Sequence, residues 1–229
     1  LLTFTVKIKN QIMLITPTKK FWEVFRSTNG ALSCCESLFI MQAAALAPKG
    51  IYIECGVAYG KSAISALQIL KEYENGKDDV RFILVDPLFD DIEIAKSVEK
   101  TVCSITEKLI PRCYEGAYST KIIPQHEKYS YAMLDSGDHE QTILDEFYLI
   151  KDRMVSGGVI VMHDLDSQYI RVREVYNMFL ATGNYEEIIP DWKSIEAYAE
   201  ENNLEDGTNQ SWHHSELKHP KFVGALKRK

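Results

Sequence analysis

The 229-residue sequence has no apolar run near the length of about 20 residues that a bilayer-spanning helix needs. It has five cysteines but no C-x-x-C pair, so we expect reduced thiols and neither a zinc site nor a disulfide framework. Positive charge is also scarce, because 26 Lys and Arg stand against 33 Asp and Glu, a net charge of -7. This balance argues against a nucleic-acid surface. Residues 1–15 lack the features of a signal peptide. These absences predict a cytoplasmic protein that acts on neither nucleic acid nor membrane.

Apolar runs alternate with segments of helical periodicity along most of the chain. Turn-forming pairs such as Asn29-Gly30 and Gly157-Gly158 separate them. We expect strands at 51–54, 81–85, 112–114, 129–134, 159–162, 185–189 and 222–226. We expect helices at 16–26, 33–47, 61–73, 91–109, 143–154 and 169–181.

Strands that alternate with helices predict an α/β fold with right-handed crossovers and a mainly parallel sheet. We divide the chain into an N-terminal arm and helical cap over residues 1–50 and a main domain over residues 51–229. The main domain carries an insertion at about 191–219, which is rich in Trp, His and acidic residues. A connection of that length in a compact domain is usually functional or disordered.

Polar side chains follow several of the expected strands. Glu54, Asp86 and Asp135 each close one, and His163-Asp164 close another. Ligands of open α/β sheets bind outside the carboxyl ends of the strands, so these groups should share one edge. Such a cluster suits a polar ligand or a cation.

The stretch from Ile51 to Ser62 predicts a strand, a tight turn and the start of a helix. Glu54 ends the apolar run, and Gly56 and Gly60 follow in the turn. Glycine lets a ligand approach the backbone and permits positive φ, and a helix N-terminus offers unpaired N–H groups. Turn glycines alone would be weak support, but Ser62 and Asp86 accompany them. The pattern therefore predicts a small-molecule cradle.

On these residues the chain resembles class I S-adenosylmethionine-dependent methyltransferases. The segment Glu54-x-Gly56-x-x-x-Gly60-x-Ser62 is similar to their first cofactor motif, and Asp86 is similar to the acid that binds the ribose hydroxyls. The resemblance implies a Rossmann-like, doubly wound, mostly parallel seven-stranded sheet with a C-terminal antiparallel hairpin. It also implies S-adenosylmethionine as cofactor, bound by Glu54, Gly56, Val57, Ala58, Tyr59, Gly60, Ser62, Asp86 and Asp135.

A narrower resemblance is to the macrocin O-methyltransferase and cephalosporin-hydroxylase-like group. It rests on three segments, 116–124, 134–139 and 157–164. In those relatives acids at the last two strand ends bind Mg²⁺, and a nearby histidine can act as base. The resemblance thus implies Asp135 and Asp164 as metal ligands. This chain has Ser136 and His163 where acids are common.

Several roles stay open at this point. The proton acceptor is His139 or His163, in partnership with Asp135. Otherwise His139 would cap a helix, and His163 would be a metal ligand or a histidine at the sheet edge. Asp135 and Asp164 either bind Mg²⁺ or hydrogen-bond the substrate. Trp212, His213 and His214 form a substrate lid or a solvated loop, and the aromatic residues of 16–26 are core or homodimer packing.

The resulting hypothesis is an enzyme that methylates a hydroxyl of a small molecule, such as a sugar or a natural-product intermediate. One alternative is an NAD(P)-dependent oxidoreductase, although Gly56 and Asp86 are 30 residues apart and that fingerprint expects about 20. The other alternative is a non-catalytic binding module with a methyltransferase fold.

Overall fold

A computed structural model of the chain describes residues 4–8, 11–15, 17–70, 81–106, 112–114, 127–136, 140–165, 169–204 and 222–229. The strands are β1 (Phe4–Ile8), β2 (Gln11–Ile15), β3 (Ile51–Cys55), β4 (Arg81–Val85), β5 (Arg112–Tyr114), β6 (Tyr129–Leu134), β7 (Met154–Met162), β8 (Tyr185–Ile188) and β9 (Gly224–Arg228). The α-helices are α1 (Lys19–Ser27), α2 (Cys34–Ala44), α3 (Lys61–Leu70), α4 (Ile92–Thr106), α6 (Glu140–Ile150), α7 (Ile170–Ala181) and α8 (Trp192–Glu201), and a 3₁₀ turn, η2, spans Pro87–Asp90.

The large sheet has seven strands in the described residues, in the order β5-β4-β3-β6-β7-β9-β8. Strands β3 to β7 run parallel, and β9 lies antiparallel to both β7 and β8. The predicted seven-stranded sheet with its C-terminal antiparallel hairpin is therefore confirmed. The chain builds outward from β3 to β5 and then returns to the other side of β3 with β6. A crevice opens at such a switch point, at the carboxyl ends of the strands.

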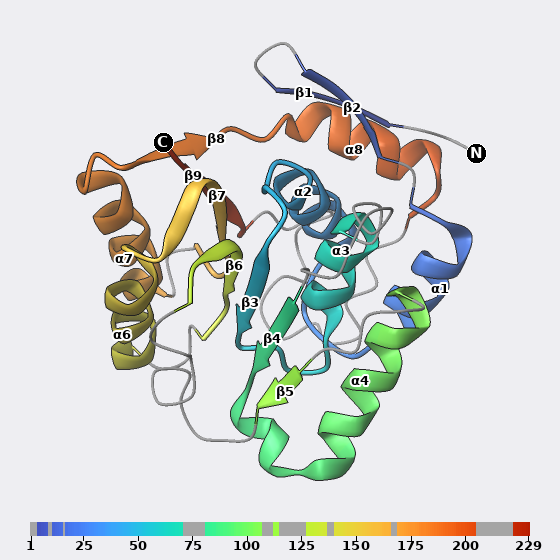
Figure 1. Ribbon diagram of the computed structural model, residues 1–229. Helices are drawn as coiled ribbons and strands as arrows, with labels where there is room; N and C mark the ends of the chain where they lie inside the picture. The colour runs from blue at the N-terminus through green and yellow to red at the C-terminus, as the bar shows by residue number, and fades with distance from the viewer. Residues whose placement is uncertain are drawn as a thin grey trace.

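Helices cover both faces of this sheet, with α6 and α7 together on one side and α2, α3 and α4 on the other (Figure 1). Alternate residues of each strand serve the two faces. Tyr52 and Tyr131 thus belong to the hydrophobic cluster beneath α2 and α3. Ile53 and Ala132 belong to the cluster beneath α6 and α7. Both faces being buried explains why the parallel strands read as continuous apolar runs.

The helices before β3 pack into this same core. Phe21 and Phe25 of α1 are buried, with ring centroids 5.7 Å apart, and every residue of α2 is buried. Ser33 begins α2 with a capping box, in which the Ser33 hydroxyl accepts the Glu36 N–H and the Glu36 carboxylate accepts the Ser33 N–H. The proposed division of the chain at residue 50 stays a prediction.

The largest error in the expected boundaries lies between α6 and β7. The helix predicted at 143–154 ends at Ile150, and Met154 begins β7 and pairs with Tyr129. Gly157-Gly158 therefore lies inside the strand and does not precede it. A register shift between β6 and β7 falls there, and a Cβ on Gly158 would lie 2.9 Å from the Val155 carbonyl oxygen. The glycines serve a bulge, which the sequence pattern did not reveal.

The predicted insertion contains a helix that we had not expected. Asp191 caps α8 by accepting the Ser194 N–H, and Ile195 and Ala199 are fully buried. Trp192 packs on Phe39 of α2, with ring centroids 5.4 Å apart. The rest of the insertion, including Trp212, His213 and His214, lies outside the described residues.

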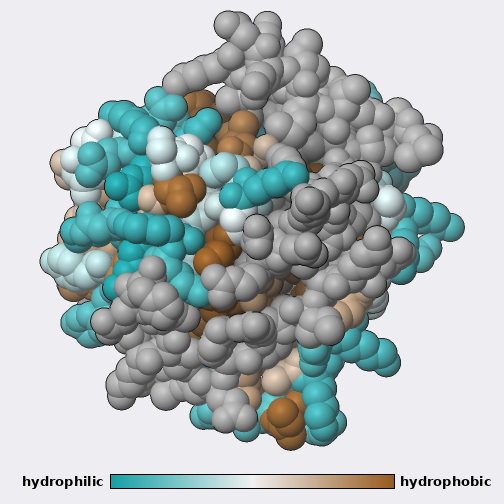
Figure 2. Space-filling model, in the orientation of Figure 1, coloured by the Kyte–Doolittle hydropathy of each residue, from teal (hydrophilic) through white to brown (hydrophobic). Residues whose placement is uncertain are grey.

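Polar residues predominate on the described surface that Figure 2 shows. On the face shown in Figure 2 the hydrophobic residues form small separate patches. Within the described ranges, no helix is both long enough and apolar enough to cross a bilayer.

Candidate active site

The polar residues predicted at the strand ends do share one edge of the sheet. Strands β3, β4, β6 and β7 are parallel and in register, with Cys55 opposite Val85 and Leu134, and Leu134 opposite Met162. Glu54 therefore lies beside the positions that lead into Asp86, Asp135 and His163. The shared edge and the parallel direction of these strands match the sequence prediction.

The turn after β3 requires glycine for two reasons. Gly56 has a φ of +83°, and a Cβ added to it would lie 2.2 Å from the backbone oxygen of Asp135. The ends of β3 and β6 meet here, and the Asp135 N–H donates to the Cys55 carbonyl at 2.8 Å. Gly60 also has positive φ, and Ala58 adopts a φ of +47° without being glycine. The turn is thus held in a conformation that few side chains tolerate.

Asp86 fastens this turn to the next strand. Its carboxylate accepts the Ala58 N–H at 2.7 Å and the Leu88 N–H at 2.7 Å, so it also caps η2. The side chain is buried. Because each carboxylate oxygen accepts more than one hydrogen bond, Asp86 retains acceptor sites for ligand hydroxyls.

Glu54 is a buried acid at the base of the turn. The Ser62 hydroxyl, in the first turn of α3, donates to it at 2.5 Å. Burial raises the pKa of Glu54 to about 8, although the Ser62 hydrogen bond opposes the shift. The negative charges of Asp135 and Asp86 add to the increase. A ligand with positive charge would favour the ionised form of Glu54. The site therefore fits a cationic ligand that also carries hydroxyls.

The remaining turn residues differ in exposure. Val57 is buried, and its carbonyl accepts the Gly60 N–H at 2.8 Å. Tyr59 is 39% exposed and reaches the surface. Tyr59 can thus contact a bound molecule, whereas Val57 supports the turn.

His163 lies among three carboxylates. Its Nδ1 is 3.2 Å from Asp135 Oδ1 and 3.1 Å from Asp164 Oδ1, and its Nε2 is 3.5 Å from Glu36 Oε1. Burial by itself would lower the pKa of His163, but the charges of Asp135 and Glu36 outweigh it and raise that pKa well above 6.5. Burial raises the pKa of Asp135 to about 6, with His163 opposing. Protons in this group are shared among its members.

Glu36 is a member of this site that was not predicted from the sequence. The Ser33-x-x-Glu36 spacing is a capping-box signature and could have identified the helix start. Nothing in the local sequence links Glu36 to a histidine 127 residues away. Conversely, His139 was predicted as the base, but it lies outside the described residues. Ser136 donates to the buried Glu146 at 2.8 Å.

The resemblance implies a Mg²⁺ ion at the carboxyl ends of β6 and β7, where three side chains could bind a metal. Asp135, His163 and Asp164 offer ligand atoms within 4.8 Å of one another. Mg²⁺ prefers oxygen ligands, whereas imidazole suits transition metals and zinc. One oxygen of each aspartate is also already directed at His163 Nδ1. The donor set does not fit Mg²⁺ well, and we assign it no step of the reaction.

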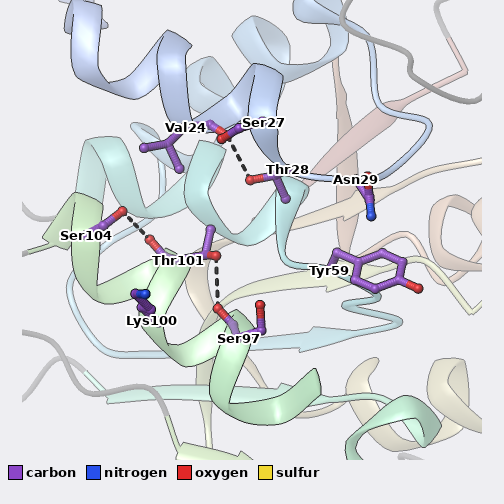
Figure 3. A pocket seen from close by; sticks show the side chains of 9 residues that line it. All are labelled: Val24, Ser27, Thr28, Asn29, Tyr59, Ser97, Lys100, Thr101 and Ser104. Carbon is purple, nitrogen blue, oxygen red and sulfur yellow. Dashed lines mark hydrogen bonds between the residues drawn. The ribbon is translucent and has the colours of Figure 1, made fainter. Parts of the chain in front are cut away.

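A groove of about 390 Å³ lies beside the turn, between α1 and α4 (Figure 3). Tyr59 of the turn lines it together with Lys100 of α4. The hydroxyls of Thr28 and Thr101 donate to carbonyls of their own helices, and their lone pairs remain for a ligand. The groove suits a polar or anionic group. Its other lining residues are Val24, Ser27, Asn29, Ser97 and Ser104.

Residues 53–165 match a family model described as a methyltransferase domain. This range runs from β3 to the residue after Asp164, so it contains the turn and the acids at the strand ends. Among curated proteins, none matches the chain.

Solved structures with a similar fold include an O-methyltransferase from Bacillus cereus in complex with SAH. It has a TM-score of 0.60 and 12% identity over 93% of this chain and 93% of that one. The O-methyltransferase TomG from Streptomyces achromogenes, involved in tomaymycin synthesis and solved with SAM, has a TM-score of 0.56 and 14% identity over 77% and 84%. CalS11, a TDP-rhamnose 3'-O-methyltransferase of calicheamicin biosynthesis, has a TM-score of 0.56 and 12% identity over 83% and 76%. These likenesses show the fold.

Proposed function

We propose that this chain is a methyltransferase that moves the methyl group of S-adenosylmethionine to an oxygen of a small molecule, as the match of residues 53–165 to a methyltransferase domain supports. The observation that carries the proposal is the pair of buried carboxyls, Glu54 and Asp86, on either side of the turn at Gly56. Asp86 would accept the ribose hydroxyls, and Glu54 would face the positive charge. Val57 to Gly60 and Ser62 would complete the cofactor site, and Asp135 would border it.

When bound, S-adenosylmethionine supplies a methyl group activated by a positively charged sulfur. The protein has to hold the acceptor oxygen in line with that carbon and remove its proton. Asp135 and Asp164 are the members of the acid–histidine cluster that a substrate can reach, since their side chains are 24% and 21% exposed and that of His163 is 8% exposed. Of the two, Asp135 directly follows β6 and borders the turn at Gly56. We propose that Asp135 Oδ2 accepts the proton of the acceptor hydroxyl, while His163 Nδ1 lies against Asp135 Oδ1. His139 remains a predicted alternative base.

We propose that the acceptor is a small molecule and that the methylated oxygen is a hydroxyl of a sugar or of a natural-product intermediate. CalS11 is described as a TDP-rhamnose 3'-O-methyltransferase, and TomG as an O-methyltransferase involved in tomaymycin synthesis. The polar groove beside Tyr59 would suit a group of the acceptor remote from the methylated oxygen. Cytoplasmic location, a homodimer and assistance by Mg²⁺ stay predictions from the sequence.

The first test is calorimetric titration of the full chain with S-adenosylmethionine. We expect the wild type to bind and Asp86→Ala to lose binding, because both the hydroxyl acceptor and the anchor of the Ala58 N–H are removed. Asp91→Ala is the matched control: Asp91 also accepts a backbone N–H, from Glu93 at 2.9 Å, but is exposed. It should bind like the wild type.

A wild type that binds no S-adenosylmethionine would overturn the proposal. The oxidoreductase alternative would then be tested by titration with NAD(H). Repeating the titration with Mg²⁺ and with EDTA, on wild type and Asp164→Ala, tests the metal. A third outcome would favour the non-catalytic module: the wild type binds S-adenosylmethionine but methylates no acceptor, and Asp135→Ala leaves that binding unchanged.

A further inference from the structure

We propose that Glu36 of α2 is a positioning residue that fixes the imidazole ring of His163 in the active site. The proposal relies on the proposed function only for the catalytic importance of His163. The spatial claim, that Glu36 sets the ring, stands on geometry alone.

The Glu36 carboxylate is itself held rigidly. The Ser33 N–H donates to Oε2 at 3.0 Å as part of the capping box, and the Phe222 N–H donates to Oε1 at 2.7 Å. The side chain is 1% exposed. Hydrogen bonds from two backbone N–H groups keep a buried carboxylate ionised and fixed in place. Burial by itself would raise the pKa of Glu36, but His163 and these two N–H groups lower it overall.

The ring of His163 is constrained from both sides. Asp135 and Asp164 face Nδ1, and Glu36 faces Nε2 at 3.5 Å. Nε2 is buried and makes no hydrogen bond within the part of the chain that the structure describes. A half-turn of the ring would direct carbon atoms at all three carboxylates. Glu36 thus helps to hold the ring in the orientation in which Nδ1, and not the carbon Cδ2, meets Asp135.

Phe222 joins this arrangement to the loop that carries Asp164. Its N–H donates to Glu36, and its carbonyl accepts the Leu165 N–H at 2.8 Å. Asp164, directly before Leu165, has a φ of +60°. Phe222, just before β9, therefore supports both Glu36, which faces Nε2 of His163, and the loop of Asp164, which faces Nδ1.

The test is a long-range ¹H–¹⁵N spectrum of the imidazole groups in the full chain at one fixed pH, with the His163 signals assigned by their loss in His163→Gln. We expect Glu36→Gln to shift and broaden the His163 ring signals. Ser33→Ala is the matched control, because it weakens the same helix cap and leaves the carboxylate beside Nε2. It should leave the ring signals where they are in the wild type.

Methyl transfer, once an acceptor is found, should fall about tenfold or more in kcat in Glu36→Gln, with KM for S-adenosylmethionine unchanged. Should Glu36→Gln not fold, Glu36→Asp withdraws the carboxylate by one methylene and should give a smaller shift in the same direction. The proposal is overturned if the ring signals of the folded Glu36 variant match those of the wild type, or if Ser33→Ala moves them equally. The spectrum needs no cofactor, so absence of S-adenosylmethionine binding would refute the proposed function and leave this result intact.

Discussion

Glu54 shows how a single buried residue sets the chemistry of the cofactor site. It is 4% exposed, and its pKa rises from 4.5 to about 8 mainly through burial. The folded protein therefore keeps the proton of Glu54 in a range where the unfolded chain has lost it. Such an acid costs stability as long as no cation lies nearby, and this is the condition in which a cationic ligand gains most.

The sign of the resulting pH dependence follows from the two protonation states. Between about pH 4.5 and pH 8 the folded state binds more protons at Glu54 than the unfolded state does. The free energy of unfolding should therefore fall as pH rises through this window, by at most about 1.4 kcal/mol per pH unit. Glu54→Gln removes this contribution to the pH dependence, because an amide does not titrate, and it keeps an oxygen that accepts the Ser62 hydroxyl. The variant should be increasingly more stable than the wild type as pH rises.

Urea denaturation at a series of pH values measures this difference. Glu23→Gln, at an exposed position of α1, is the control and should follow the wild type at every pH. Wild-type and Glu54→Gln curves that run parallel from pH 5 to 8 would contradict the assignment. Glu54→Gln should also weaken binding of S-adenosylmethionine, since the facing charge is gone.

At the scale of elements, the turn after β3 matters because it crosses the end of β6. Gly56→Ala would force a Cβ to within 2.2 Å of the Asp135 oxygen and also strain a φ of +83°. Gly183→Ala is matched for strain alone, with a φ of +72° and nothing within 4 Å. We expect Gly183→Ala to cost about 1–2 kcal/mol and Gly56→Ala clearly more, with loss of cofactor binding. Thermal melts measure the stability loss of each variant, and calorimetry measures its cofactor binding. Equal losses of stability would show that the close contact between the turn and the end of β6 is unimportant.

The sequence predicted those elements whose signals are local. Apolar runs that end in Glu54 and Asp86 identified β3 and β4 because both faces of a parallel strand are buried. The bulge at Gly157-Gly158 was misplaced because the same glycine pair is typical of a turn. Helix α8 was missed because its apolar positions, Ile195 and Ala199, are few and its partner is α2.

The residues of the site, like the elements, were predictable where their signal is local. Each acid at a strand end follows its own strand, and the topology rule then places all of them on one edge. Glu36 could not be found in this way, because it comes from a helix before the sheet and reaches His163 only through tertiary packing. Likewise, the hydrogen bond from Ala58 to Asp86 depends on how the turn folds back over β4.

At the scale of the whole molecule, the C-terminal strand joins the two hydrophobic layers. β9 lies between β7 and β8, with Ala225 in the cluster beneath α2 and Leu226 in the cluster beneath α7. Two strands, β6 and β7, lie between β9 and β3, which carries the cofactor turn. Stability and cofactor binding should therefore respond independently to a change in β9, as substitutions at distant sites usually do.

Leu226→Ala tests this independence. Leu226 is fully buried, and its truncation should cost about 2–5 kcal/mol through lost apolar contact and a cavity. Saturating S-adenosylmethionine stabilises the folded state by binding it alone, about 2.7 kcal/mol at a hundredfold excess over Kd. That increment should be the same in Leu226→Ala as in the wild type, and it should vanish in Asp86→Ala. Lys227→Ala, at the neighbouring and partly exposed position, should change neither quantity. Denaturant titrations with and without cofactor measure both, and an increment that shrinks in Leu226→Ala would mean that β9 and the turn are coupled across the sheet.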